Sequence, residues 1–153
     1  MLKSILLALA VFGLLAVSFV FIKAFRPAEK IKLVEVKIGN EIFKVEIADN
    51  FSSRARGLSG RDGLGSHEGM LFIFPVAMPQ GFWMKDMKFP IDIIWIRDSK
   101  AIGMIIGAEP EPGPDYTIYS SPEPADMVLE VNAGTAQRFG MKIGDAVELK
   151  NGY

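Results

Sequence analysis

Hydrophobic and polar residues alternate along much of the chain, and this period of two predicts β-strands. The clearest case is a hairpin predicted over residues 33–47, where Gly39-Asn40 supplies a two-residue turn between two alternating runs. In this register Val36 faces Phe43, and both side chains fall on the apolar face of the hairpin. In this register the apolar residues of both runs lie on the same face, which specifies how the two strands pair.

Six further strands are predicted from similar apolar or alternating runs. They span residues 69–74, 80–85, 90–97, 101–106, 126–132 and 146–150. Pro75 is expected to bound the first of these, because proline cannot donate a ladder hydrogen bond. In the run 90–97, Asp92 shares a face with Ile94 and Ile96, which places a carboxylate on an apolar side of the predicted sheet.

Two short helices are predicted between the strands. Cap-forming side chains at 49–53 precede a helix at 54–58, and a second helix at 133–139 is closed by Gly140. The proline-rich segment 107–124 is expected to be a long loop, either a functional flap or a loosely ordered excursion. About eight short strands with two short helices and no β-α alternation predict a mostly antiparallel β-sandwich or barrel.

An uncharged apolar run of 18 residues covers 5–22 and is flanked by Lys3 and Lys23. Its length is close to the ~20 residues that cross a bilayer as a helix. A cleaved signal peptide with its site at Ala16-Val17-Ser18 is the alternative, but the apolar run continues past that site and favours an uncleaved anchor. The chain is thus expected to divide into an anchor or signal segment (1–26), a linker (27–31) and one β-domain (32–153).

This organisation predicts a membrane partner through residues 5–22 and a domain outside the cytoplasm, or secreted if the signal is cleaved. The first 26 residues hold 3 of the 17 basic residues and none of the 18 acidic ones, which leaves 14 against 18, a formal charge of −4, for residues 27–153. A mildly acidic domain is poorly suited to bind nucleic acid, so we expect no nucleic-acid partner.

The chain contains no cysteine, which excludes disulfides, thiolate metal ligands and a cysteine nucleophile. His67 is the single histidine. A serine triad would have to use it without a Gly-x-Ser-x-Gly elbow, and a metal site would lack a second imidazole. We therefore expect no metal and no cofactor.

Four sequence segments occur in a specific order along residues 31–150. They are Arg54-Ala55-Arg56-Gly57-Leu58-Ser59-Gly60-Arg61, Glu68-Gly69-Met70-Leu71-Phe72-Ile73-Phe74, Phe82-Trp83-Met84-Lys85 with Pro90-Ile91-Asp92-Ile93-Ile94, and Val128-Leu129-Glu130-Val131 with Ala133-Gly134. Through these segments the chain resembles the DUF192 family. The resemblance implies a compact, mainly β fold of sandwich or jelly-roll type, often behind an exported or membrane-inserted N-terminus, and no established reaction. The chain departs from the family's usual pattern at two places, since Asp86-Met87 replaces Asn-Thr and Ser59 replaces Met.

Charged and aromatic side chains are interleaved in the segment 69–96, which indicates a candidate ligand-binding patch. Small-ligand pockets are commonly built from aromatic walls with a few fixed polar groups. The candidate binding residues are Trp83, Lys85, Asp86, Asp92, Arg54, Arg61, Glu68 and Glu130. A structural alternative is that Asp92 or Asp86 pairs with a cation, because a buried carboxylate needs a partner whether or not a ligand exists. The available cations are Arg54, Arg56, Arg61 and Lys85.

Three functions remain open at this point. The leading hypothesis is a non-enzymatic domain that binds a small ligand or a protein partner through the aromatic and charged patch. The second is a carboxylate-dependent hydrolase of a cell-envelope or carbohydrate substrate that uses Asp92, Glu68 or Glu130. The third is a structural accessory of a membrane complex.

Overall fold

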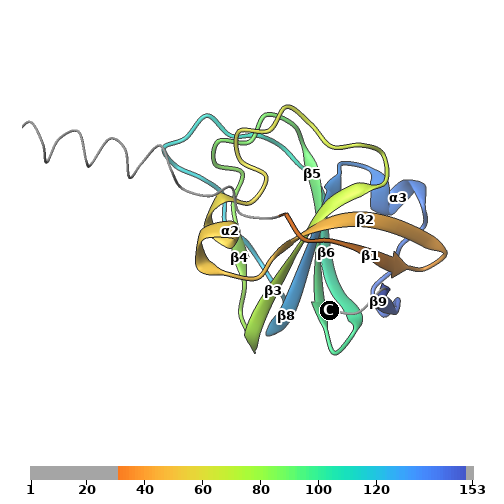
Figure 1. The fold of residues 1–153 in the computed structure, drawn as a ribbon. Coiled ribbons are helices and arrows are strands. Elements are labelled where there is room, and N and C mark those ends of the chain that lie inside the picture. Colours follow the sequence, from red (N-terminus) through yellow and green to blue (C-terminus); the bar gives the residue numbers. More distant parts are fainter. Residues whose placement is uncertain (1–30, 151–153) are drawn as a thin grey trace, which may run out of the picture. The chain divides into compact units, whose positions relative to one another are not determined.

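The computed structural model describes residues 31–150, which form a mainly β fold of two sheets with two short helices (Figure 1). Its elements are β1 (Leu33–Ile38), β2 (Glu41–Ala48), α2 (Phe51–Arg56), β3 (Glu68–Met78), β4 (Gly81–Phe82), β5 (Ile91–Arg97), β6 (Lys100–Ala108), β7 (Tyr119–Ser120), β8 (Ala125–Asn132), α3 (Thr135–Arg138) and β9 (Val147–Lys150). The larger sheet has seven strands in the order β6-β5-β8-β3-β2-β1-β9, and β4 pairs with β7 in a two-stranded sheet.

The β1–β2 hairpin has the predicted register. Val36 pairs with Phe43 and Glu35 with Lys44 across the Gly39-Asn40 turn. Gly39 has a φ of 59°, in the left-handed region that glycine adopts without steric cost. The alternation of apolar residues and the turn therefore suffice to determine this pairing.

The seven-stranded sheet is mixed, because β2 and β3 run parallel. The other neighbouring strands in this sheet pair antiparallel. Parallel neighbours need a crossover connection, and α2 together with the loop that follows it carries the chain back to the start of β2. The sheet is thus mostly antiparallel, as expected, but the parallel pairing of β2 with β3 was not predicted.

The seven-stranded sheet curls into a half-barrel. Its two edge strands meet near one corner, where Lys100 forms a bridge with Ala146. The Ala101 amide donates to the oxygen of Asp145 at 3.0 Å, and the Val147 amide donates to the oxygen of Ser99 at 2.9 Å. The concave side holds a hydrophobic core that includes Val36, Phe43, Leu71, Ile94, Ile96 and Leu129.

A second hydrophobic core lies on the other face of the central strands. It includes Phe72, Ile93, Trp95 and Val128, together with Leu58 and Met84 from segments outside the large sheet. Successive residues of a strand point to opposite faces, and for this reason Ile93 and Ile94 belong to different cores. The candidate site described below lies on this second face.

Two predicted strand boundaries were wrong. Strand β3 continues past Pro75 to Met78, since the pairing with β8 shifts register between Ile73 and Met78 and the proline falls in this irregular part. The strand predicted over 80–85 is reduced to Gly81–Phe82. After Phe82 the chain turns, and Asp86 adopts a φ of 57°.

Both predicted helices are present with shifted ends. Helix α2 starts at Phe51, because Asn50 caps it through a capping box with Ser53. Helix α3 spans Thr135–Arg138 only. The predicted loop at 107–124 contains β7, whose Tyr119 pairs with Phe82 of β4.

The apolar run 5–22 lies outside the described residues. Within 31–150, no helix has the length and apolar character needed to cross a bilayer.

Candidate functional site

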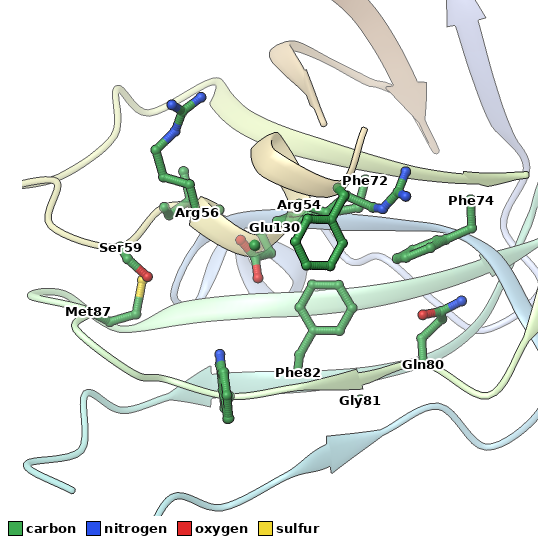
Figure 2. A pocket seen from close by; sticks show the side chains of 15 residues that line it. Arg54, Arg56, Ser59, Phe72, Phe74, Gln80, Gly81, Phe82, Met87 and Glu130 are labelled. Carbon is green, nitrogen blue, oxygen red and sulfur yellow. The ribbon is translucent and has the colours of Figure 1, made fainter. Parts of the chain in front are cut away.

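A cavity of about 290 Å³ opens on the second face of the sheet, between β3, β8, α2 and β4 (Figure 2). Helix α2 and the residues after it provide Phe51, Arg54, Ala55, Arg56, Gly57, Leu58 and Ser59; the sheet provides Phe72, Phe74 and Glu130; the β4 side provides Gln80, Gly81, Phe82, Trp83 and Met87. Most of these side chains are apolar or aromatic, so the cavity resembles a small-ligand pocket in character.

Aromatic rings form the walls of this pocket. Phe72 and Phe82 meet edge to face, with ring centroids 5.0 Å apart and planes at 89°. Trp83 is 53% exposed, and the Lys85 ammonium lies 5.7 Å from its ring centroid. Tyr116 from the long loop lies 6.0 Å from the same ring. Trp83 and Lys85, two of the candidate binding residues, thus lie against one another at the edge of the pocket.

Glu130 is the acidic residue of the pocket lining. Its register partners are Met70 on β3 and Ile93 on β5, so it lies in the middle of the sheet and is only 5% exposed. Among residues 31–150, Glu130 has no hydrogen-bond or ion-pair partner. Burial raises the pKa of Glu130 to about 8, against the opposing effect of the Arg61 charge. The carboxyl group is therefore largely protonated at neutral pH.

Arg61 is the cation that would be expected to pair with Glu130, but it is bonded to Glu46. Its guanidinium donates to both carboxylate oxygens of Glu46, from Nη2 at 2.6 Å. This hydrogen bond lowers the pKa of Glu46 and raises that of Arg61. Glu46 and Glu130 are both register partners of Met70, from opposite sides of β3. The two acids thus lie two strands apart, and the arginine forms its hydrogen bonds with only one of them.

The two arginines that line the cavity, Arg54 and Arg56, are directed away from Glu130. Figure 2 shows the Arg54 guanidinium near Phe74 and that of Arg56 on the far side of α2 from the phenylalanine rings. Arg54 Nη1 donates to the oxygen of Ile73 at 2.9 Å, and its guanidinium lies 5.3 Å from the Phe74 centroid. Gln80, a polar residue of the lining on the side of β4, is buried.

The Asp92 side chain lies on the opposite face of the seven-stranded sheet from Glu130. It is 0% exposed, and its carboxylate accepts hydrogen bonds from the amides of Gly107 at 2.8 Å, Gly134 at 2.9 Å and Ala136 at 2.8 Å. Asp92 does not form the ion pair with Arg54, Arg56, Arg61 or Lys85 that was considered as the structural alternative for Asp92 or Asp86. Three main-chain donors from β6 and the start of α3 satisfy the charge instead.

Lys85 and Asp86 contact the loop after α2 through their main-chain oxygens. Ser59 Oγ donates to the oxygen of Lys85 at 2.9 Å, and the Gly60 amide donates to the oxygen of Asp86 at 2.8 Å. The positive φ of Asp86 is one that aspartate and asparagine adopt more readily than other side chains. The replacement of the family's usual Asn by Asp86 therefore suits the same turn.

The structure brings three of the eight predicted site residues into the pocket lining: Arg54, Trp83 and Glu130. Arg61 acts on Glu130 through its charge. Glu68 is exposed and accepts a hydrogen bond from the Gly65 amide at 2.9 Å, outside the lining. Of the three acids considered for hydrolysis, only Glu130 lines the cavity.

The sequence interpretation missed Phe72, Phe74, Phe82, Gln80, Met87 and Arg56 as lining residues. The alternation of Phe72 and Phe74 along β3 was visible in the sequence. It did not indicate a pocket, because the same pattern is typical of a closed core.

His67 packs against aromatic rings at another place in the domain. Its ring centroid lies 5.7 Å from that of Phe43 and 5.4 Å from that of Phe139, and its Nε2 lies 3.4 Å from a Glu41 oxygen. Across residues 31–150, no three acidic or histidine side chains gather in a way that suits a metal ion.

A model of the DUF192 family, described as "Uncharacterized ACR", matches residues 34–149. Two solved structures are similar. One, a proposed transcription regulator from Sinorhizobium meliloti 1021, has 31% identity and a TM-score of 0.75, with 80% of this chain and 98% of that chain covered. The other, a protein of unknown function from Novosphingobium aromaticivorans DSM 12444, has 34% identity and a TM-score of 0.73, with 80% and 89% covered. No protein with a curated description matches the chain.

Proposed function

The chain belongs to the DUF192 family, and we propose that its β-domain is a non-enzymatic module that binds a small molecule in the pocket around Glu130. The observation that carries this proposal is Glu130 itself, which is 5% exposed and has no polar partner among the described residues. Burying a carboxyl group without a hydrogen bond costs free energy. A ligand that satisfies this group would recover part of that cost.

The size of the pocket limits the ligand to a small molecule. Its volume of about 290 Å³ is at the lower end of the ~300–1,000 Å³ typical of ligand pockets. The edge-to-face pair of Phe72 and Phe82 offers an apolar surface for one ring or a short aliphatic body. A single compact group thus suits the space better than an extended chain.

A ligand-binding role is compatible with the description of one relative as a proposed transcription regulator, since a regulator needs a signal. We do not extend the proposal to DNA binding. Residues 27–153 carry 14 basic against 18 acidic residues, and DNA binding relies on clustered positive charge.

The hydrolase hypothesis has less support. A raised pKa suits Glu130 for general acid catalysis, but such chemistry also needs a second carboxylate at the cavity. Glu46 is bonded to Arg61, and Asp92 is bonded to main-chain amides on the other face. No observation favours the role of a structural accessory over ligand binding.

We also propose that residues 5–22 hold the domain at a membrane, outside the cytoplasm. The 18-residue apolar run between Lys3 and Lys23 supports this placement. Fractionation with alkaline carbonate, followed by protease treatment of intact and permeabilised cells, tests it. The full-length chain should stay in the membrane pellet and be degraded without permeabilisation. Extraction into the supernatant as a full-length protein would contradict the anchor.

The binding proposal is tested by fragment screening of the full chain in a mild detergent, with amide NMR shifts as the readout. Fragments that enter the pocket should shift resonances of residues 57–59, 81–83 and 129–131. Phe82→Ala should weaken these shifts, and Ile143→Ala, at an exposed position away from the pocket, should not. The proposal fails if no fragment shifts these resonances in the folded protein, or if Phe82→Ala binds them equally well.

A further inference from the structure

The surroundings of Glu130 restrict the chemical class of the ligand. The charged residues around the Glu130 carboxyl group are Arg61 from the loop after α2, Glu46 on β2 and Glu68 on β3, and its neighbour on β5 is Ile93. Arg54 and Arg56 of α2 line the same cavity, with their guanidinium groups directed away from Glu130. Arg61 and Glu46 neutralise one another through two hydrogen bonds. Glu68 is exposed at the start of β3. The Glu130 carboxyl group thus lacks a bonded cation and faces aromatic rings.

We propose that the pocket selects an uncharged ligand that presents a carboxamide, or an equivalent adjacent donor and acceptor, to the Glu130 carboxyl group and an apolar ring to Phe72 and Phe82. This inference rests on the proposed binding function and names its ligand class.

The neutral Glu130 carboxyl group supports a ligand that both donates and accepts a hydrogen bond. A neutral carboxyl group carries one O–H donor and one carbonyl acceptor side by side. A carboxamide carries the complementary N–H and carbonyl, so the two groups form a cyclic pair of hydrogen bonds. Burial, which raises the pKa of Glu130 to about 8, keeps the carboxyl group in the neutral form that this pairing needs.

Charged ligands are disfavoured at this position. An ammonium group would approach Arg61, whose charge already acts on Glu130, and would have to leave water for aromatic walls. A carboxylate would lose its hydration, and the Arg54 and Arg61 guanidinium groups are bonded to Ile73 and Glu46. A neutral amide avoids both costs.

The test compares three fragments that share one ring and differ in the polar group: benzamide, benzoate and benzylamine. Each is titrated at pH 6.5 into the full chain in a mild detergent, with shifts of residues 81–83 and 129–131 as the readout. Benzamide should bind at least about tenfold more tightly than either charged fragment. A tenfold difference in affinity corresponds to the net contribution of one to two hydrogen bonds.

Two variants of Glu130 separate its hydrogen bonds from its charge. Glu130→Gln keeps a donor and an acceptor and should retain benzamide binding within about threefold, whereas Glu130→Leu should lose about tenfold or more. Wild-type affinity for benzamide should fall as the pH rises from 7 to 10, and that of Glu130→Gln should stay constant. Glu148→Gln, at an exposed acid on β9, serves as the control and should follow the wild type.

The outcomes distinguish the ligand class from the binding function. Equal binding of the three fragments, or tightest binding of benzylamine with an affinity that increases with pH, overturns the ligand class and leaves pocket binding in place. Benzamide binding that Glu130→Leu does not change also overturns it. The absence of shifts with all three fragments, together with a negative wider screen, overturns both proposals.

Discussion

A Cβ atom on Gly69 would lie 2.5 Å from the main-chain oxygen of Glu130. Gly69 lies on β3 and pairs with Val131 on β8, whose side chain would also be 3.1 Å away. No side chain fits at this distance without a movement of backbone. The glycine therefore determines how closely β8 approaches β3 at the level of the pocket acid.

Gly69→Ala should destabilise the protein by about 1–3 kcal/mol and displace Glu130, because the methyl group overpacks the contact between two strands. Urea unfolding measures the first effect, and the amide shifts of residues 129–131 report the second. Gly63→Ala is the matched control, since a Cβ there meets no atom within 4 Å. Equal stability of the two variants would contradict the close approach.

Glu130 should make the folded state less stable as the pH rises from about 4.5 to about 8. Folded Glu130 keeps its proton up to about pH 8, whereas the unfolded chain releases it near the ordinary pKa of 4.5. Between these values the folded state binds more protons, so the free energy of unfolding falls by up to about 1.4 kcal/mol per pH unit and then levels off. Urea unfolding at pH 5 to 9 measures this slope.

The same slope should disappear in Glu130→Gln and remain in Glu148→Gln. Glu46 does not contribute to this slope. Arg61 lowers the pKa of Glu46, so the stability that the Glu46–Arg61 pair provides is lost only as the pH falls below 4.5. If the free energy of unfolding of Glu130→Gln still falls with pH, another group causes the fall.

Asp92→Ala should destabilise the protein by roughly 3 kcal/mol or more, since three main-chain amides, of which that of Ala136 is buried, lose a charged acceptor. Chemical denaturation measures the change, and crystallography or NMR should show disorder at the start of α3. Asp62→Ala, at an exposed acid that pairs with Lys88, should remain close to the wild type. A mild effect of Asp92→Ala would contradict its structural role.

Asp86→Asn should leave stability unchanged, whereas Asp86→Val should cost about 1–2 kcal/mol, because a β-branched side chain is strained at a φ of 57°. The urea midpoints of the two variants test this difference. Asp115→Val, at an exposed loop position without a positive φ, controls for the loss of charge. Similar losses in both valine variants would point to charge rather than backbone conformation.

Local features of the sequence predicted the elements whose partners are close along the chain. The β1–β2 hairpin followed from the alternation around Gly39-Asn40, and helix α2 followed from the caps before it. The assignment of Asp92 to the face of Ile94 was also confirmed, because strand periodicity determines faces without reference to other strands. Trp83 and Glu130 were identified as candidate site residues from their chemical type and their surroundings in the sequence.

The sequence by itself determined the register of the β1–β2 hairpin, the presence of helix α2 and the face on which Asp92 lies, since each depends on residues near in the chain. The family followed from the order of its segments along the chain. Only the tertiary structure decided that β3 runs parallel to β2 and that Arg61 bonds Glu46 and leaves Glu130 unpaired. It also decided that Asp92 is satisfied by main-chain amides. These relationships join residues that are 15 to 44 positions apart. An acid pairs with a cation only if folding brings the two close together, and the residue types alone do not specify these distances.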